Sequence, residues 1–268
     1  MLIGAALLWG LAGVCVKSIT WGPMAIVAVR SIISLVILLA VKRSFRVKMT
    51  RQNLLGAFFM SATSILYISA IKMTTAGTAI VLQYIAPILV FLFAVLFRGR
   101  KPRAAEIVLT LSVFAGCVLS FLDSLDFTML LGNALALLSG FTFAGQLLVM
   151  NGQDNEPVDA MILSNFLCFL ISVPFLFTEP LDWSAKNIFW LLVLSVFQYG
   201  LANLLFSRSI QHVDPVEASL VLTIEPVFNP IPVAHFCGEQ MSLPAIVGAV
   251  MVVAAVTLHG MLPPAESG

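Results

Sequence analysis

Ten long apolar runs follow one another along this chain, separated by short polar or turn-forming breaks such as Trp21-Gly22-Pro23 and Asp214-Pro215. Each run is close to the ~20 apolar residues that a helix needs to cross a bilayer. Of all residues, 60% are hydrophobic and only 10% are charged, too few charges to cover a soluble surface. The sequence therefore predicts an all-α membrane protein and excludes a soluble enzyme, a nucleic-acid binder and a disordered chain. The ten expected transmembrane helices occupy about 2–19, 23–41, 53–72, 76–97, 104–122, 129–150, 158–177, 186–207, 215–236 and 242–261.

Basic residues predict how this bundle lies in the membrane, because Lys and Arg collect in cytoplasmic loops. The loops after 23–41 and 76–97 together carry nine of them, whereas the loops after 2–19, 53–72 and 104–122 carry two, Lys17 and Lys72. With ten helices, both termini are then cytoplasmic. We expect a multi-pass protein of the bacterial cytoplasmic (inner) membrane, whose first apolar run is a retained helix and not a cleaved signal peptide.

The chain resembles itself when it is shifted by 139 residues. Pro87 then falls on Pro226, and Gly99 falls on Gly238. Proline and glycine each impose a backbone requirement, so these pairs are more informative than matches between apolar residues. The unit is five helices, which predicts two repeats at 1–125 and 126–268. Because five is odd, the second repeat is inverted in the membrane. Inverted repeats around a central cavity are typical of transporters, and an ancient duplication without a mechanistic role is the alternative.

Two charged residues stand far from any expected membrane surface, Arg30 in the second helix and Glu225 in the ninth. At a rise of about 1.5 Å per residue, both lie near the middle of a hydrocarbon core that is about 30 Å thick. Charges at this depth usually face a cavity or a partner. We therefore expect Arg30 and Glu225 to form an ion pair or a coupling site, directly or through a substrate. A structural pair that only locks helix packing is the alternative.

Neutral polar and aromatic residues add a candidate cavity wall, because several of them share one face of a helix. In the helix 186–207 this face carries Ser195, Gln198, Tyr199 and Asn203. Small polar residues also hold membrane helices together, so packing is the alternative to lining for each stripe. The predicted substrate-binding residues are Trp9, Ser64, Tyr67, Gln83, Tyr84, Gln146, Gln198, Tyr199, Asn203, Glu225 and Asn229.

Two prolines interrupt the expected helices at equivalent places in the two repeats. Pro87 and Pro226 each remove a backbone hydrogen bond in mid-membrane. Such interruptions are tolerated only beside protein or a wet cavity. We expect a kink at both positions and predict that the kinks act as hinges.

The residues singled out above resemble those of a known family, the EamA-type carriers of the drug/metabolite transporter superfamily. The resemblance covers essentially the whole chain. It rests on Trp9-Gly10, Arg30, Ala70-Ile71-Lys72, Thr75-Ala76, Pro87, Glu225-Pro226-Val227-Phe228 and Gly238-Glu239. The first repeat departs from the pattern, because Ala86-Pro87 and Gly99-Arg100 lack the two acids. The resemblance implies ten helices in inverted halves, a central cavity and alternating access for small metabolites. Known members of the family export amino acids and other metabolites, and some import them.

The sequence thus predicts a secondary active or facilitative transporter of a small polar metabolite, an amino acid or a similar compound. It would work by alternating access, with export as the expected direction. The alternative is a passive channel or a membrane-embedded structural subunit. We expect no enzymatic activity, no cofactor and no metal, because the sequence has no catalytic motif and no metal-ligand spacing of His or Cys. The expected partners are the solute, the lipid bilayer and, as a candidate coupling ion, protons. We expect no nucleic acid, and a monomer or a homodimer.

Overall fold

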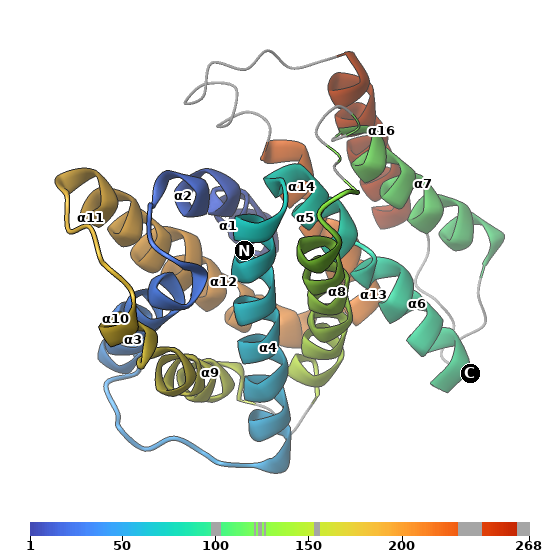
Figure 1. Cartoon of the computed structure of the whole chain (residues 1–268). Helices are drawn as coiled ribbons and strands as arrows, with labels where there is room; N and C mark the ends of the chain where they lie inside the picture. Colours follow the sequence, from blue (N-terminus) through green and yellow to red (C-terminus); the bar gives the residue numbers. More distant parts are fainter. Residues whose placement is uncertain are drawn as a thin grey trace.

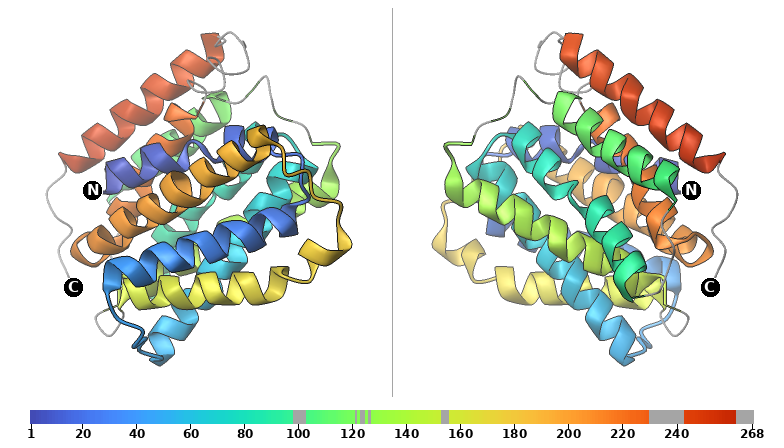
Figure 2. Two further views of the ribbon diagram at one scale, coloured as in Figure 1. Left: turned by 90° about the vertical axis from the view of Figure 1, so that its left-hand side faces the viewer. Right: turned by 90° about the vertical axis from the view of Figure 1, so that its right-hand side faces the viewer.

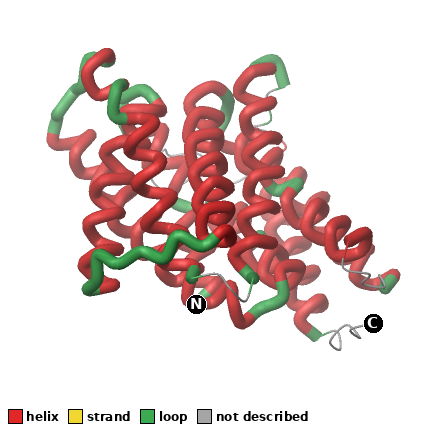
Figure 3. The backbone as a smooth tube through the Cα atoms, turned by 90° about the horizontal axis from the view of Figure 1, so that it is seen from below, coloured by secondary structure: helices red, strands yellow, loops and turns green. Residues whose placement is uncertain are grey.

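A computed structural model describes the protein at residues 1–97, 103–120, 122, 125, 127–152, 156–229 and 243–261. Within these ranges the chain consists of helices joined by loops and contains no strand (Figure 3). The motif pairs Gly99-Arg100 and Gly238-Glu239, and the end of the expected ninth helix, lie outside the described residues.

The described helices follow the predicted order of spans, and several spans are divided into two or more pieces (Figure 1). In the first repeat they are α1 (Leu2–Trp9), α2 (Ala12–Ser18), α3 (Pro23–Lys42), α4 (Arg51–Met73), α5 (Ala76–Gln83), α6 (Ala86–Phe97) and α7 (Ala104–Ser120). In the second repeat they are α8 (Leu130–Met150), α9 (Pro157–Ser172), α10 (Phe175–Thr178), α11 (Ala185–Leu192), η2 (Val193–Leu201), α12 (Ala202–Ser209), η3 (Ile210–His212), α13 (Pro215–Leu222), α14 (Ile224–Phe228) and α16 (Leu243–Gly260).

Length and hydropathy mark many of these helices as membrane spans. Among the described residues, six are long and apolar enough to cross a bilayer: Pro23–Lys42, Arg51–Met73, Ala76–Phe97, Leu130–Met150, Pro157–Thr178 and Ala185–Ile210. Shorter apolar helices lie at Leu2–Ser18, Ala104–Ser120 and Ile246–His259. The prediction of an all-α protein with multiple membrane spans is confirmed.

The outer surface of the bundle is apolar and its interior holds polar groups. Leu96, Phe97, Leu130 and Phe177 leave more than two thirds of their area exposed. Asparagines and serines are buried in large number instead, among them Asn53 at 0% exposure. A soluble protein has the opposite distribution, so this surface suits lipid and the buried polar groups suit a site inside the bundle.

Two glycines explain the pairing of α7 with α16, which lie side by side at one edge of the bundle (Figures 1 and 2). A Cβ atom added at Gly116 would come within 2.7 Å of Val252 Cγ2 and within 2.9 Å of the Gly248 carbonyl oxygen. A Cβ added at Gly248 would lie 2.5 Å from the Gly116 oxygen. Small residues allow this close backbone approach, which drives helix association where no hydrophobic effect operates.

The predicted interruptions near Pro87 and Pro226 are present as breaks between helices. The helix of the fourth span stops at Gln83 and resumes at Ala86, and that of the ninth span stops at Leu222 and resumes at Ile224. Tyr84 and Thr223, the residues at the two breaks, are related by the predicted shift of 139. The breaks thus occupy equivalent places in the two repeats, while the role of either proline as a hinge stays a prediction.

At the start of the third and eighth spans, the two repeats align with a shift that differs from 139. Thr50 caps α4 by accepting from the Asn53 backbone N–H, and Ser184 caps α11 by accepting from the Asn187 N–H. These residues are related by a shift of 134, not 139. The eighth span is therefore five residues longer than the third. The eighth span also contains the π-helix η2 and the 3₁₀ turn η3, whereas the third is one continuous α-helix.

Candidate functional site

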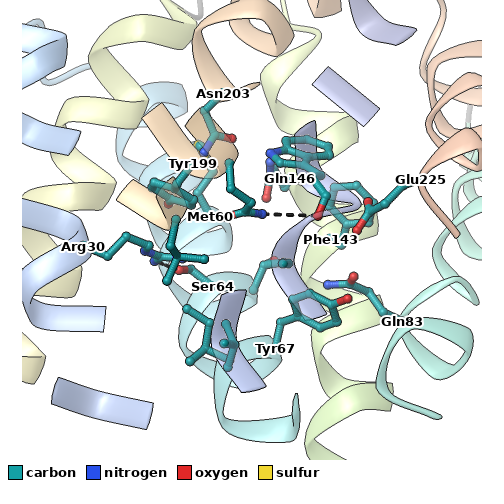
Figure 4. Close-up of a pocket in the computed structure, with 17 residues that line it drawn as sticks. Arg30, Met60, Ser64, Tyr67, Gln83, Phe143, Gln146, Tyr199, Asn203 and Glu225 are labelled. Carbon is teal, nitrogen blue, oxygen red and sulfur yellow. Dashed lines mark hydrogen bonds between the residues drawn. The ribbon is translucent and has the colours of Figure 1, made fainter. Parts of the chain in front are cut away.

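A cavity lies in the middle of the bundle, between helices of both repeats (Figure 4). Its volume is about 80 Å³. A mostly apolar wall with a few convergent polar groups is typical of a ligand site. The residues that line it are Trp9, Ala12, Val16, Arg30, Met60, Thr63, Ser64, Tyr67, Ile68, Gln83, Phe143, Gln146, Leu194, Gln198, Tyr199, Asn203 and Glu225.

Nine of the eleven predicted substrate-binding residues lie in this wall, together with Arg30. The other two, Tyr84 and Asn229, are buried outside it and bind backbone carbonyls. Binding of a substrate by the nine stays a prediction, but their convergence on one cavity is a fact of the structure. They are Trp9, Ser64, Tyr67, Gln83, Gln146, Gln198, Tyr199, Asn203 and Glu225.

Arg30 forms one side of the cavity. Its guanidinium donates to the Ser64 hydroxyl, and its Cζ lies 3.8 Å from the centre of the Tyr199 ring. The aromatic face attracts the cation through its quadrupole, so α3, α4 and η2 meet around one buried positive charge. The prediction placed Arg30 near a cavity from its charge alone and included no polar stripe on the helix 23–41.

Glu225 lies at the opposite side of the cavity from Arg30 (Figure 4). Its Oε2 is 2.8 Å from the Tyr84 hydroxyl, which is also 2.7 Å from the Leu222 carbonyl oxygen. Pro226 has no N–H, so the Leu222 carbonyl lacks its intrahelical donor four residues on and is free to accept from Tyr84. The Tyr84 hydroxyl therefore joins the helix break before Pro226 to the carboxyl group of Glu225.

The expected direct ion pair between Arg30 and Glu225 is not formed. The two ion pairs among the described residues join Lys42 to Asp159 and Lys48 to Glu156, both outside the cavity. Arg30 instead bonds Ser64, and Glu225 bonds Tyr84. The pair had been inferred from similar depth in the membrane, which does not fix position around the bundle. A pair bridged by a substrate stays a prediction.

Asn229 ties two helix breaks together. Its Nδ2 donates to the Gly10 carbonyl oxygen at 2.7 Å, and Gly10 lies between α1 and α2. A carbonyl at the end of a helix has no intrahelical donor, so the amide serves as its partner. This bond engages the Asn229 amide, and Asn229 is not among the residues that line the cavity, so its role in substrate binding stays a prediction.

A π-helix places the cavity residues of the eighth span on one face. Leu194 and Asn203, both in the wall, are nine positions apart, or about two and a half turns of an α-helix, which would point them in opposite directions. Hydrogen bonds from i to i+5 in η2 put more residues into each turn and bring them together. Ser195, expected on this face, instead donates to Leu191 O at 2.6 Å, and its own carbonyl accepts from Ser34.

Three buried polar atoms in the wall have no hydrogen-bond partner within the described protein: Arg30 Nε, Gln198 Oε1 and Asn203 Nδ2. An unsatisfied buried polar atom costs about 1–3 kcal/mol. Two donors and one acceptor on facing helices therefore offer bonds to a polar ligand.

Apolar members of the wall were not predicted. Met60, Ile68, Phe143 and Leu194 lie beside the polar residues at helical spacing, and Trp9 packs edge-on against Phe143 at a centroid distance of 5.9 Å. In a membrane helix an apolar residue that faces a cavity has the same composition as one that faces lipid. Only its distance along the helix from a known polar lining residue would have indicated it.

The family of the chain follows from a comparison with known proteins. The model of the EamA-like transporter family matches it twice, at residues 1–122 and 130–261. The chain belongs to the EamA-like transporter family. The resemblance noted in the sequence is confirmed, and the EamA match in two parts confirms the two repeats, while a boundary between residues 125 and 126 stays a prediction.

Two individual proteins resemble this EamA chain. A protein of Bacillus subtilis (strain 168) described as "Uncharacterized transporter YxxF" is 26% identical over 215 residues, which are 77% of this chain and 68% of that protein. A solved structure described as "Crystal structure of protein" superimposes with a TM-score of 0.79 at 18% identity, covering 96% of this chain and 95% of that one. The second likeness shows the fold alone. The family and the first relative point to a membrane transporter and not to an enzyme.

Proposed function

We propose that this EamA-family transporter carries a small zwitterionic metabolite, an amino acid or a similar compound, by alternating access through the central cavity. The observation that carries the proposal is a cation at one side of the cavity, Arg30, and a carboxyl group at the other, Glu225. The proposed direction is export across a bacterial inner membrane, with both termini in the cytoplasm. The distribution of basic residues between the loops supports that orientation.

The unpartnered atoms suggest how such a solute would bind. A carboxylate would accept from Arg30 Nε, a charge-assisted bond that is shorter and stronger than a neutral one. An ammonium group would face Glu225, and the amides of Gln198 and Asn203 would bond the polar atoms between the two ends. Trp9 and Phe143 would cover an apolar side chain. A proton on Glu225 is the proposed coupling ion.

A thermal-shift screen with amino acids, matched carboxylic acids and matched amines tests this proposal. A ligand at 100 times its Kd stabilises the folded protein by about 2.7 kcal/mol, and the zwitterions should give the largest shift. Gln198→Leu and Asn203→Leu should abolish the shift and still give folded protein. Asn165→Leu is the control, because Asn165 is also buried but lies outside the cavity wall and donates to Met161 O in its own helix. A shift that survives both cavity substitutions would contradict the proposed site.

Charge selectivity gives a second test of the same site. Arg30→Met should weaken the binding of zwitterions and acids by about 10- to 150-fold, the loss of one hydrogen bond to a charged group, and leave the binding of amines nearly unchanged. Equal losses for acids and amines would show that Arg30 shapes the cavity without contacting a carboxylate.

Flux measurements in proteoliposomes separate a carrier from the alternative function. A carrier shows saturable counterflow that accelerates when solute is present on the opposite side. A passive channel shows no such acceleration, and a structural subunit shows no flux of the solute at all. Either of the last two results would refute transport by alternating access.

A further inference from the structure

An asparagine joins the two repeats at one end of the bundle. Asn53 Nδ2 donates to the Lys48 carbonyl oxygen at 2.7 Å, and its Oδ1 accepts from the backbone N–H of Glu156 at 2.8 Å. Lys48 lies in the segment 43–50, which runs below α9 to the start of α4 (Figure 1), and Glu156 directly precedes α9. We call Lys48, Asn53 and Glu156 the Asn53 clamp.

A second asparagine repeats this arrangement at the other end. Asn187 Nδ2 donates to the Asp182 carbonyl oxygen at 2.8 Å, and its Oδ1 accepts from the backbone N–H of Thr20 at 3.1 Å. Thr20 shortly precedes α3, and Asp182 lies in the segment 179–184 before α11, at the opposite end of the helices from the segment 43–50 (Figure 2). We call Thr20, Asp182 and Asn187 the Asn187 clamp.

Two members of each clamp correspond under the shift of 134, Lys48 with Asp182 and Asn53 with Asn187. Each asparagine stands three residues after a capping hydroxyl, in Thr50-Arg51-Gln52-Asn53 and Ser184-Ala185-Lys186-Asn187. Each amide bonds the carbonyl five residues before it, and each is almost fully buried, at 0% and 1% exposure. Each asparagine lies in the first turn of its helix, where its side chain can bond nearby backbone groups. Its recurrence with the same two bonds indicates one device that is used twice.

Each clamp leads directly into the cavity wall. The first residue of α4 in the wall is Met60, seven positions after Asn53, and the first of the eighth span is Leu194, seven positions after Asn187. Seven residues are about two helical turns, or roughly 10 Å. The cavity therefore lies between the two clamps, which are at opposite ends of the bundle, and each clamp joins one repeat to the other.

The clamps differ in charge. Both ion pairs of the described residues adjoin the Asn53 clamp: Lys48 bonds Glu156, and Lys42 bonds Asp159, whose Oδ2 also accepts from the Lys48 N–H at 2.9 Å. The hydrogen bond and the charge of the Glu156 carboxylate raise the pKa of Lys48 above its ordinary value. The Asn187 clamp is closed instead by Trp21, which donates to Asp182 O and packs on Trp183.

We propose that Asn53 and Asn187 are the positioning residues of two opposed gates, of which one releases while the other holds during transport. The proposal rests on the proposed function, since only a carrier needs each end to open in turn. Alternating access in inverted repeats moves one repeat against the other around a fixed site. Such a movement separates segments of different repeats at one end, and the clamps are buried polar bonds between such segments.

Thiol labelling from each side of the membrane tests the gates without a substrate. The four native cysteines are replaced by alanine, and Met60→Cys supplies a reporter in the cavity wall. An impermeant thiol reagent is applied to sealed vesicles of both orientations, and the measured quantity is the labelling rate from the Asn53 side divided by that from the Asn187 side. Asn53→Ala should raise this ratio and Asn187→Ala should lower it, each by at least about tenfold, because two hydrogen bonds of Asn53 or four of Asn187 are lost at one end only.

A matched control distinguishes a gate from a structural asparagine. Asn165 is buried to the same degree, but its amide donates within its own helix. Asn165→Ala should leave the ratio unchanged even if it lowers stability. A ratio that moves in the same direction in both clamp variants, or in neither, would overturn the proposal.

Two exposed substitutions keep the test decisive if a buried variant does not fold. Lys48→Glu places a second negative charge beside Glu156 and should raise the ratio, as Asn53→Ala does. Asp182→Ala removes a carboxylate that accepts from Asn187 Nδ2 at 2.9 Å and should lower it. An unchanged labelling ratio in both variants would overturn the proposal of two gates. If the ratios move as expected but no zwitterion stabilises the protein, the gates stand and the proposed solute is wrong.

Discussion

Replacement of Glu225 by glutamine tests whether this carboxyl group carries a proton in the cavity. The Tyr84 hydroxyl lies within 2.8 Å of two acceptors, Glu225 Oε2 and the Leu222 oxygen, but it has one proton to donate. A charged carboxylate has to share the Tyr84 hydrogen with the Leu222 oxygen, whereas a protonated carboxyl can donate to the Tyr84 oxygen and leave that hydrogen to Leu222. A glutamine amide donates in the same way, so Glu225→Gln imitates the protonated form.

The expected change in stability follows from these contacts. If Glu225 were the partner of Arg30, glutamine would break a buried ion pair and cost about 3–5 kcal/mol. The structure gives the two groups separate partners, and glutamine keeps the bond to Tyr84. The cost should then stay below about 1 kcal/mol, which corresponds to a fall in Tm of no more than about 2–4 °C. Arg30→Met combined with Glu225→Gln should show a coupling below about 0.5 kcal/mol.

Transport by Glu225→Gln should no longer respond to an imposed pH gradient, since the group that binds and releases the proton is gone. The assay is uptake into proteoliposomes at a fixed solute gradient, with the internal pH varied and the wild-type protein measured in parallel. A wild-type response to pH in the variant would refute the role of Glu225 as the coupling group. A loss of stability above about 3 kcal/mol would refute the reasoning from its contacts.

Three further predictions concern parts of the molecule outside the cavity. Asp159→Ala should lower the free energy of unfolding by about 3 kcal/mol in denaturation experiments, because Asp159 is 1% exposed and its removal leaves a partly buried lysine unpaired; Glu156→Ala, at an exposed pair, should cause no measurable loss. Gly116→Ala should destabilise the protein by about 1–3 kcal/mol, since the backbone of the facing helix leaves no room for a methyl group. A tag at Gly268 should be accessible only after permeabilisation, whereas a cysteine at Ser124 should react from outside intact cells, and the reverse pattern would contradict the predicted orientation.

The helices could be predicted from the sequence because each depends on a local requirement. A run of about 20 apolar residues is needed to cross the bilayer whatever the rest of the chain does, and proline and glycine mark where helices start or break. The break before Pro226 is such a case, because the ring removes a bond that only its own helix could supply. Nine residues of the cavity wall were found for a related reason, since polar groups on a lipid face are excluded.

The remaining errors arise from partners that are distant in sequence. Asn229 is polar and stands one turn after Glu225, yet it faces a carbonyl freed by the break between α1 and α2. Ser195 was placed on the cavity face by α-helical spacing, which the π-helix η2 does not follow. Arg30 and Glu225 were paired on an estimate of depth along their helices, but they lie at opposite sides of the cavity. In each case the deciding contact belongs to another helix, so no pattern within one span could reveal it.

Differences between the two repeats bear on which access state the protein favours when no solute is bound. Two identical inverted repeats would give the two access states equal energy, and each 1.4 kcal/mol of difference changes their ratio about tenfold. The Lys42–Asp159 pair beside Asn53 has no counterpart at the Asn187 clamp among the described residues, so it favours closure at the Asn53 end. Under the predicted orientation this end is cytoplasmic. A solute can open it only by binding the open state more tightly than the closed one, and Lys48→Glu should therefore increase accessibility from this side before any solute is added.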